Sequence, residues 1–164
     1  MMDETSRELT AFASILGLAG FVLLVVAAAS TGAMFKPGAW YEALAKPVWT
    51  PPNWLFPVAW TILYLMIAVA GWLVWREAGL AGARPALTLY FLQLILNAAW
   101  SWLFFGLHRM DLAMIDIVAL WLAVAATIAA FYAVSLPAAL LLVPYLAWVS
   151  YAAALNFAIW QANT

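Results

Sequence analysis

Five apolar segments, each long enough to cross a lipid bilayer, dominate this sequence. A helix needs about 20 mainly apolar residues to span the hydrocarbon core. The segments that meet this length are 9–30, 55–75, 86–107, 112–134 and 138–160. Strands of a membrane barrel would alternate apolar and polar residues over about ten positions, and the sequence lacks that pattern. The sequence therefore predicts an all-α fold, with residues 1–164 forming one integral membrane bundle of five transmembrane helices.

The composition agrees with lipid as the main solvent. Hydrophobic residues make up 70% of the chain and charged residues only 8%, whereas soluble domains are about 25% charged. The six Lys and Arg are scattered, so the chain has no basic stripe that would bind nucleic acid. Without cysteine, disulfides and thiolate metal sites are excluded.

The first apolar segment has two possible interpretations. Small residues after it resemble a signal-peptide cleavage site, but the run exceeds the usual signal length of about 7–15 apolar residues. Its amino end is also acidic, with Asp3, Glu4 and Glu8 beside a single Arg7. We expect this segment to be a retained helix.

The first connection, residues 31–54, is the longest and is rich in proline and tryptophan. Its end overlaps the stretch "KPVWTPPNWLFPVAW" at 46–60. Each proline fixes φ and favours extended backbone before it, so "TPP" predicts a short rigid rod. Aromatic residues are depleted in disordered segments, and long loops in compact domains are often lids or binding elements. We therefore predict that this loop forms the lid of a pocket.

An aromatic face continues from this loop into the second predicted helix. Its residues recur at spacings of three and four, which places them on one side: Trp60, Tyr64, Ala68, Gly71 and Trp75. Tryptophans at helix ends are typical of an interfacial aromatic belt, and we assign Trp54, Trp75 and Trp160 to it. Trp60 lies about one turn inside its helix, so we expect it to line a pocket.

The third predicted helix carries a polar line on an otherwise apolar span. The line consists of Tyr90, Gln93, Asn97, Trp100 and Phe104. Two explanations remain open: the amides form hydrogen bonds between helices, or they supply the few polar groups of an apolar ligand site. On the fifth helix, Pro144 frees a carbonyl group, and Trp148, Tyr151 and Ala152 follow on one side.

Asp116 is the one charged residue inside the predicted spans. Intramembrane charges are costly and often functional. A proton relay would need a second charged residue within the spans, and the sequence has none. We therefore expect Asp116 to have a structural role, facing the bundle or reaching towards the interface.

Three long segments resemble the translocator protein family, TspO/MBR, also called tryptophan-rich sensory protein or peripheral-type benzodiazepine receptor. They are "WYEALAKPVWTPPNWLFPVAWTILY" at 40–64, "LYFLQLILNAAWSWLFFG" at 89–106 and "VPYLAWVSYAAALNFAIW" at 143–160. The resemblance covers nearly the whole chain, and "TGAMFKPGAW" is similar to the bacterial branch. It implies a multi-pass membrane protein of the bacterial cell envelope.

The resemblance also implies a homodimer with a pocket closed by the first loop. Its expected ligands are porphyrins such as protoporphyrin IX and isoquinoline or benzodiazepine-type molecules, with no required cofactor and no metal. By motif position, the ligand-binding residues would be Trp40, Tyr41, Trp49, Trp60, Asn97, Trp100, Trp148 and Ala152, to which spacing adds Tyr64 and Phe104. In a catalytic interpretation, Trp60 and Trp148 would take part in light-dependent porphyrin breakdown.

One departure weakens an expectation from the family. The sterol-recognition segment at the end of the last helix should contain a tyrosine followed by a basic residue, but this chain has Phe157 and Gln161. Sterol binding by that route is therefore doubtful. Lys36 and Lys46 in the first loop could pair with porphyrin propionates, or they could simply be solvated.

Three functional hypotheses follow. The first is a receptor or carrier that holds a porphyrin between the first loop and helices two, three and five, with a role in tetrapyrrole regulation or transport. The second is an enzyme that degrades protoporphyrin IX, and the third is a membrane adaptor tuned by ligand. The single histidine, His108, lies beside Arg109 at a helix end, which favours metal-free or weakly ligated porphyrin over a haem protein.

Overall fold

The structure is a computed structural model that describes the backbone of residues 4–164 and the side chains of residues 11–164. The side chains of Asp3, Glu4, Arg7 and Glu8, which bear on the signal-peptide alternative, lie outside the described residues. From Glu4 onward, the first segment is a continuous helix.

Within the described residues, the chain is helical and contains no strand. The elements are α1 (Glu4–Met34), α2 (Ala39–Ala43), α3 (Leu55–Gly82), α4 (Arg84–Ser101), α5 (Met110–Tyr132) and α6 (Leu136–Ala162), with a π-helical segment η1 (Trp102–Gly106) continuing α4. Five of them, with α4 and η1 counted together, are long and apolar enough to cross a membrane. The predicted fold class, an all-α bundle of five spanning helices, is confirmed.

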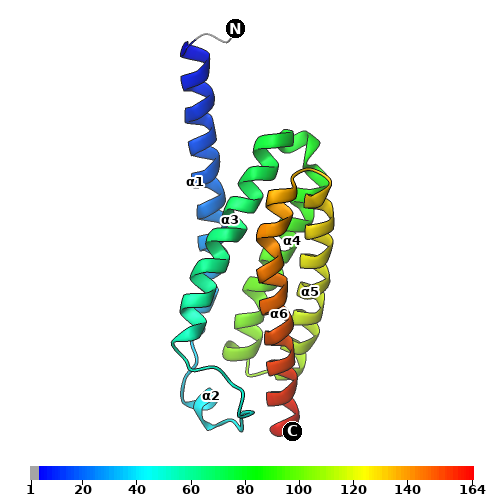
Figure 1. Cartoon of the computed structure of the whole chain (residues 1–164). Helices are drawn as coiled ribbons and strands as arrows, with labels where there is room; N and C mark the ends of the chain where they lie inside the picture. Colours follow the sequence, from blue (N-terminus) through cyan, green and yellow to red (C-terminus); the bar gives the residue numbers. More distant parts are fainter. Residues whose placement is uncertain (1–3) are drawn as a thin grey trace.

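The five long helices pack side by side (Figure 1), and the contacts between them close into a ring. Going around it, α1 contacts α3, α3 contacts α6, α6 contacts α5, α5 contacts α4, and α4 returns to α1. The short helix α2 lies at the end of the bundle where the chain terminates (Figure 1). The first loop and the end of α6 therefore share one end of the molecule.

The helix ends differ from those of the apolar runs from which we predicted them: α3 extends past its run, whereas α5 ends at Tyr132, before residue 134. α3 continues through Arg76 and Glu77 to Gly82, because backbone hydrogen bonding does not stop where hydrophobicity does. Gly79, at φ 64°, interrupts this extension in a conformation that glycine adopts without strain. α4 then begins with Pro85 in its first turn, where a missing N–H is tolerated.

Close approach of α1, α3 and α4 depends on glycines. A Cβ atom on Gly71 would lie 2.7 Å from both Phe21 and Tyr90, and one on Gly17 would lie 2.1 Å from Trp75. Trp75 therefore packs against α1, and its assignment to the interfacial belt stays a prediction. Trp54, which is 65% exposed, agrees better with the belt assignment.

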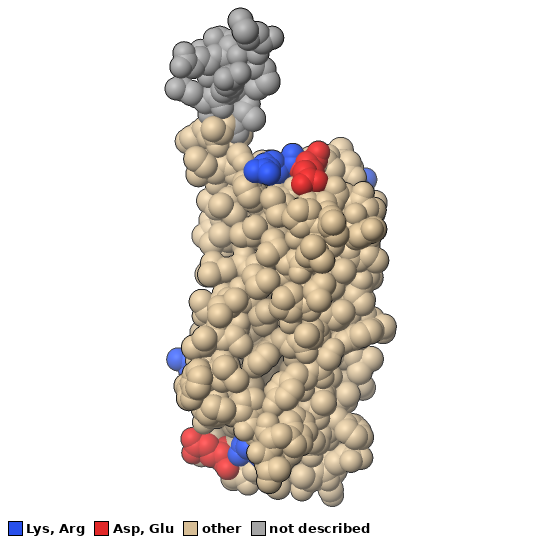
Figure 2. Space-filling model, in the orientation of Figure 1, with Lys and Arg blue, Asp and Glu red and all other residues tan. Residues whose placement is uncertain are grey.

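Charged residues gather towards the two ends of the molecule (Figure 2). On the face shown in Figure 2, the surface between the ends carries few charged residues, as expected where helices meet hydrocarbon. Asp116 does not contribute to the ends, since it is 8% exposed and lies inside the bundle. Its Oδ2 atom has no hydrogen-bond partner among the described residues.

Candidate functional site

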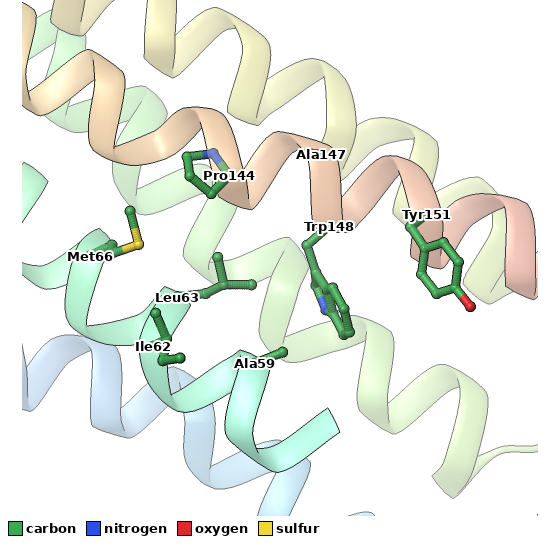
Figure 3. Close-up of a pocket in the computed structure, with 8 residues that line it drawn as sticks. All are labelled: Ala59, Ile62, Leu63, Met66, Pro144, Ala147, Trp148 and Tyr151. Atoms are coloured by element: carbon green, nitrogen blue, oxygen red, sulfur yellow. The ribbon is translucent and has the colours of Figure 1, made fainter. Parts of the chain in front are cut away.

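A groove of about 400 Å³ lies between α3 and α6 (Figure 3). Its lining is Ala59, Ile62, Leu63 and Met66 from α3, and Pro144, Ala147, Trp148 and Tyr151 from α6. Ala59 and Ala147 are small, so the two helices leave space between them. Ile62 is 54% exposed at this surface, which shows that the groove opens sideways from the bundle.

Trp148 forms one wall of the groove and is held by other aromatic rings. Its ring lies 6.0 Å from that of Phe56, edge to face, and 5.8 Å from that of Tyr151. Such aromatic pairs add about 0.5–1.5 kcal/mol beyond the burial of area. The wall is therefore positioned before any ligand arrives.

Beside the groove, hydrogen bonds join α3, α4 and α6 through their polar side chains. Tyr64 Oη donates to Asn97 Oδ1 at 2.8 Å, and Asn97 Nδ2 donates to Tyr145 Oη at 3.0 Å. Tyr145 Oη in turn donates to Gln93 Oε1 at 3.0 Å. Trp60 stacks on Tyr64, with 5.1 Å between ring centroids.

This network bears on the polar line predicted for the third helix. Both amides, Asn97 and Gln93, form hydrogen bonds between helices, the first of the two explanations left open. Gln93 Nε2 is buried and has no partner among the described residues. The role of Asn97 in ligand binding stays a prediction.

The first loop covers a second group of aromatic residues. Trp40 stacks on His108, with 4.1 Å between ring centroids, and meets Phe104 edge to face. Tyr41 is 5% exposed and contacts the same phenylalanine. Trp100 stacks on Phe104 at 5.0 Å. These rings form a compact cluster at the loop end of the bundle, and we call Trp40, Tyr41, Trp100, Phe104 and His108 the loop cluster.

The predicted binding residues therefore divide into two sets. Trp148 lines the groove, while Trp49, Trp60, Tyr64, Asn97 and Ala152 lie on or next to the helices that form it. Trp40, Tyr41, Trp100 and Phe104 belong to the loop cluster. None of these four loop-cluster residues lines the groove between α3 and α6.

Lys46 is engaged within the loop. Its Nζ atom donates to the backbone oxygens of Glu42 and Leu44, each at 3.1 Å, and lies 4.7 Å from the ring centroid of Tyr41. Lys36 is exposed. Burial raises the pKa of the Tyr41 hydroxyl, and the nearby Tyr151 raises it further. The Tyr41 side chain is therefore neutral beside the ammonium group.

Two side chains, one in α6 and one at its C-cap, link the first loop to the bundle by hydrogen bonds. Tyr151 Oη donates to the backbone oxygen of Trp49 at 2.9 Å. Asn163, at the end of the helix, accepts from the Ala45 N–H and donates to the Ala45 oxygen, both at 3.0 Å. The segment "TPP", predicted to be extended, is non-helical. It directly follows Trp49, whose backbone oxygen accepts the hydrogen bond from Tyr151.

Sequence reasoning missed several residues of this site. Tyr145 joins two amides at the centre of the network, and Asn163 binds the loop. A signal for Tyr145 existed, since a tyrosine hydroxyl inside an apolar span needs a hydrogen-bond partner. Asn163 gave no such signal, because the residue with which it pairs lies 118 positions away.

The fold and the site define a class of protein: a five-span membrane protein with an aromatic-walled groove open to the side and a tethered loop at one end. Comparison with known proteins gives the family. Residues 21–161 match the model of the TspO/MBR family. The chain belongs to this family, as its motifs predicted, and it is an integral membrane protein.

Relatives span bacteria and animals. The chain is 45% identical over 140 residues to protein CrtK of Rhodobacter capsulatus, covering 83% of this chain and 86% of the relative. It is 43% identical to the tryptophan-rich sensory protein of Cereibacter sphaeroides, covering 87% and 89% of the two chains. It is also 40% identical to the human translocator protein, covering 88% of each.

Proposed function

We propose that the protein is a membrane receptor or carrier for porphyrins and similar flat hydrophobic ligands, including isoquinoline and benzodiazepine types, with a role in tetrapyrrole regulation or transport. The observation that carries the proposal is the groove between α3 and α6, where Trp148 and Tyr151 form an aromatic wall. The names of two relatives, a sensory protein and a translocator protein, agree with a receptor or carrier.

The chemistry of the groove supports a planar aromatic ligand. Its lining is almost entirely apolar, and the only lining side chains that carry a hydrogen-bond donor are those of Trp148 and Tyr151. Ligand pockets of about 300–1,000 Å³ with few polar groups are typical of small-molecule sites. The sideways opening gives access from the bilayer, where hydrophobic ligands concentrate.

The test is to fill the groove and measure porphyrin affinity. Ala147 lies at its edge, so Ala147→Phe places a ring where the ligand would bind. Ala154→Phe is the matched control, because Ala154 is exposed on the same helix and does not line the groove.

Quenching of tryptophan fluorescence by protoporphyrin IX in detergent reports affinity. We expect the Kd to rise roughly tenfold or more for Ala147→Phe, which corresponds to about 1.4 kcal/mol, and to stay unchanged for the control. Equal affinity in both variants would contradict this site.

A second candidate is light-dependent breakdown of protoporphyrin IX. The observation in its favour is that Trp148, an oxidisable side chain, lies in the wall of the groove itself. Illumination of the loaded protein separates the two functions, with the Soret absorption band as the readout. Equal loss of the band in wild type and in Trp148→Phe indicates photobleaching of a bound ligand. When the porphyrin concentration saturates both proteins, loss in wild type alone indicates catalysis.

A further inference from the structure

We infer that Tyr151 couples the groove to the first loop, so that a ligand in the groove stabilises the closed loop through this side chain. The inference rests on the proposed function, because it assigns regulation to the same site. It makes Tyr151 a positioning residue that acts on the loop, in addition to its place in the wall.

Tyr151 belongs to the wall of the groove and to the anchor of the first loop at the same time. Its ring lines the groove beside Trp148, as Figure 3 shows. Its hydroxyl donates to the backbone oxygen of Trp49 at 2.9 Å, and its ring meets the Trp49 indole edge to face at 5.6 Å. A single side chain therefore forms part of the ligand surface and part of the loop anchor.

The second contact between α6 and the loop, made by Asn163, differs because this residue lies outside the groove. Asn163 binds both backbone atoms of Ala45 and also donates to the Ile159 oxygen at 2.7 Å. It lies at the end of α6 and does not line the groove. Both hydrogen-bonded contacts hold the loop. Only Tyr151 also lines the groove, so only its contact can respond to a bound ligand. The chain thus offers its own control.

The direction of the coupling follows from linkage. When the loop is closed, the bond to Trp49 fixes the orientation of the Tyr151 ring in the wall. A ligand that packs against that ring binds more tightly when the ring is already oriented, because less freedom is lost on binding. By reciprocity, the ligand must favour the closed loop by the same factor.

The experiment is hydrogen–deuterium exchange of the full chain in detergent, followed over residues 44–54, with and without protoporphyrin IX. Wild type is compared with Tyr151→Phe, which keeps the ring and removes the hydroxyl, and with Asn163→Leu. We expect the porphyrin to slow exchange of the loop in wild type and in Asn163→Leu, but not in Tyr151→Phe. Without ligand, both variants should exchange faster than wild type, and the Ala45 amide should respond most to Asn163→Leu.

Affinity provides a second measure of the coupling. Loss of one hydrogen bond should raise the Kd of Tyr151→Phe for protoporphyrin IX by about two- to tenfold, mostly through faster dissociation. Ligand protection of the loop that survives in Tyr151→Phe would overturn the inference. So would porphyrin quenching in wild type without any change in loop exchange, which leaves the proposed function intact. Absence of quenching in wild type instead overturns the proposed function itself, and the coupling to porphyrin with it.

Discussion

The hydroxyl of Tyr64 on α3 donates a 2.8 Å hydrogen bond to the side-chain oxygen of Asn97 on α4. Asn97 is 5% exposed, and its side-chain nitrogen donates a hydrogen bond to the Tyr145 hydroxyl on α6. Helices in a bilayer associate through close packing and such polar contacts, because lipid offers no hydrophobic drive between them. This asparagine therefore connects the two sides of the groove through the interior.

Replacement of this amide should loosen the bundle. Asn97→Leu leaves the Tyr64 hydroxyl without its acceptor and Tyr145 without its donor. We expect the free energy of unfolding in detergent to fall by about 1–3 kcal/mol, the cost of unsatisfied buried polar groups. Thr61→Val is the control, since Thr61 is exposed and bonds only within its own helix. Equal unfolding of the two variants would show that the network contributes no stability.

Close packing of α1 on α3 gives a second prediction. A Cβ atom on Gly71 would lie 2.7 Å from the rings of Phe21 and Tyr90, both held in the core. Gly71→Ala should destabilise the protein by about 1–3 kcal/mol, as expected for overpacking. Gly20→Ala should have no such cost, because no neighbouring atom lies within 4 Å of the position that its Cβ would occupy. Thermal unfolding of the two variants is the measurement. A Gly71→Ala protein that melts with wild type would mean that these rings move aside freely.

The main features of this fold could be predicted from the sequence, because they depend on the local length and spacing of apolar residues. Hydrophobic length alone located the five spanning helices, and spacing placed Gln93 and Asn97 on one buried face. The exact helix ends were not readable. α3 continues past its apolar run, and the end of α4 becomes the π-helical segment Trp102–Gly106. Both depend on backbone geometry that side-chain hydrophobicity does not report.

The site was harder to predict from the sequence than the fold, because it depends on contacts between residues that are distant in the sequence. The short helix α2 and the pairing of Asn163 with Ala45 join segments far apart in sequence. Spacing also could not separate Trp40 from Trp148, since both are tryptophans beside motifs of the same family. The structure assigns the first to the loop cluster and the second to the groove.

This separation predicts different effects for the two tryptophans. Trp148→Ala removes a wall of the groove and should raise the Kd for protoporphyrin IX roughly tenfold or more, which corresponds to about 1.4 kcal/mol. Trp40→Ala removes the stack on His108 and the contact with Phe104. It should lower the melting temperature while changing the Kd less than about threefold, or roughly 0.7 kcal/mol. Fluorescence quenching and thermal unfolding of both variants provide the comparison. If Trp40→Ala weakens porphyrin binding as much as Trp148→Ala does, the ligand contacts the loop cluster.

Lys46 gives the last prediction, because its contacts compete with a role in binding propionates. Its ammonium group is held by the backbone oxygens of Glu42 and Leu44 and by the face of Tyr41. Cation–π contacts at exposed sites are worth about 0.5–1 kcal/mol, and release from all three partners would oppose pairing with a ligand. We therefore expect Lys46→Met to speed hydrogen exchange over residues 42–46. The same variant should leave unchanged the ratio of affinities for protoporphyrin IX and its uncharged dimethyl ester. Lys36→Met, at an exposed position of the same loop, is the matched control. A ratio that falls in Lys46→Met alone would show that the lysine leaves its carbonyl partners to bind a propionate.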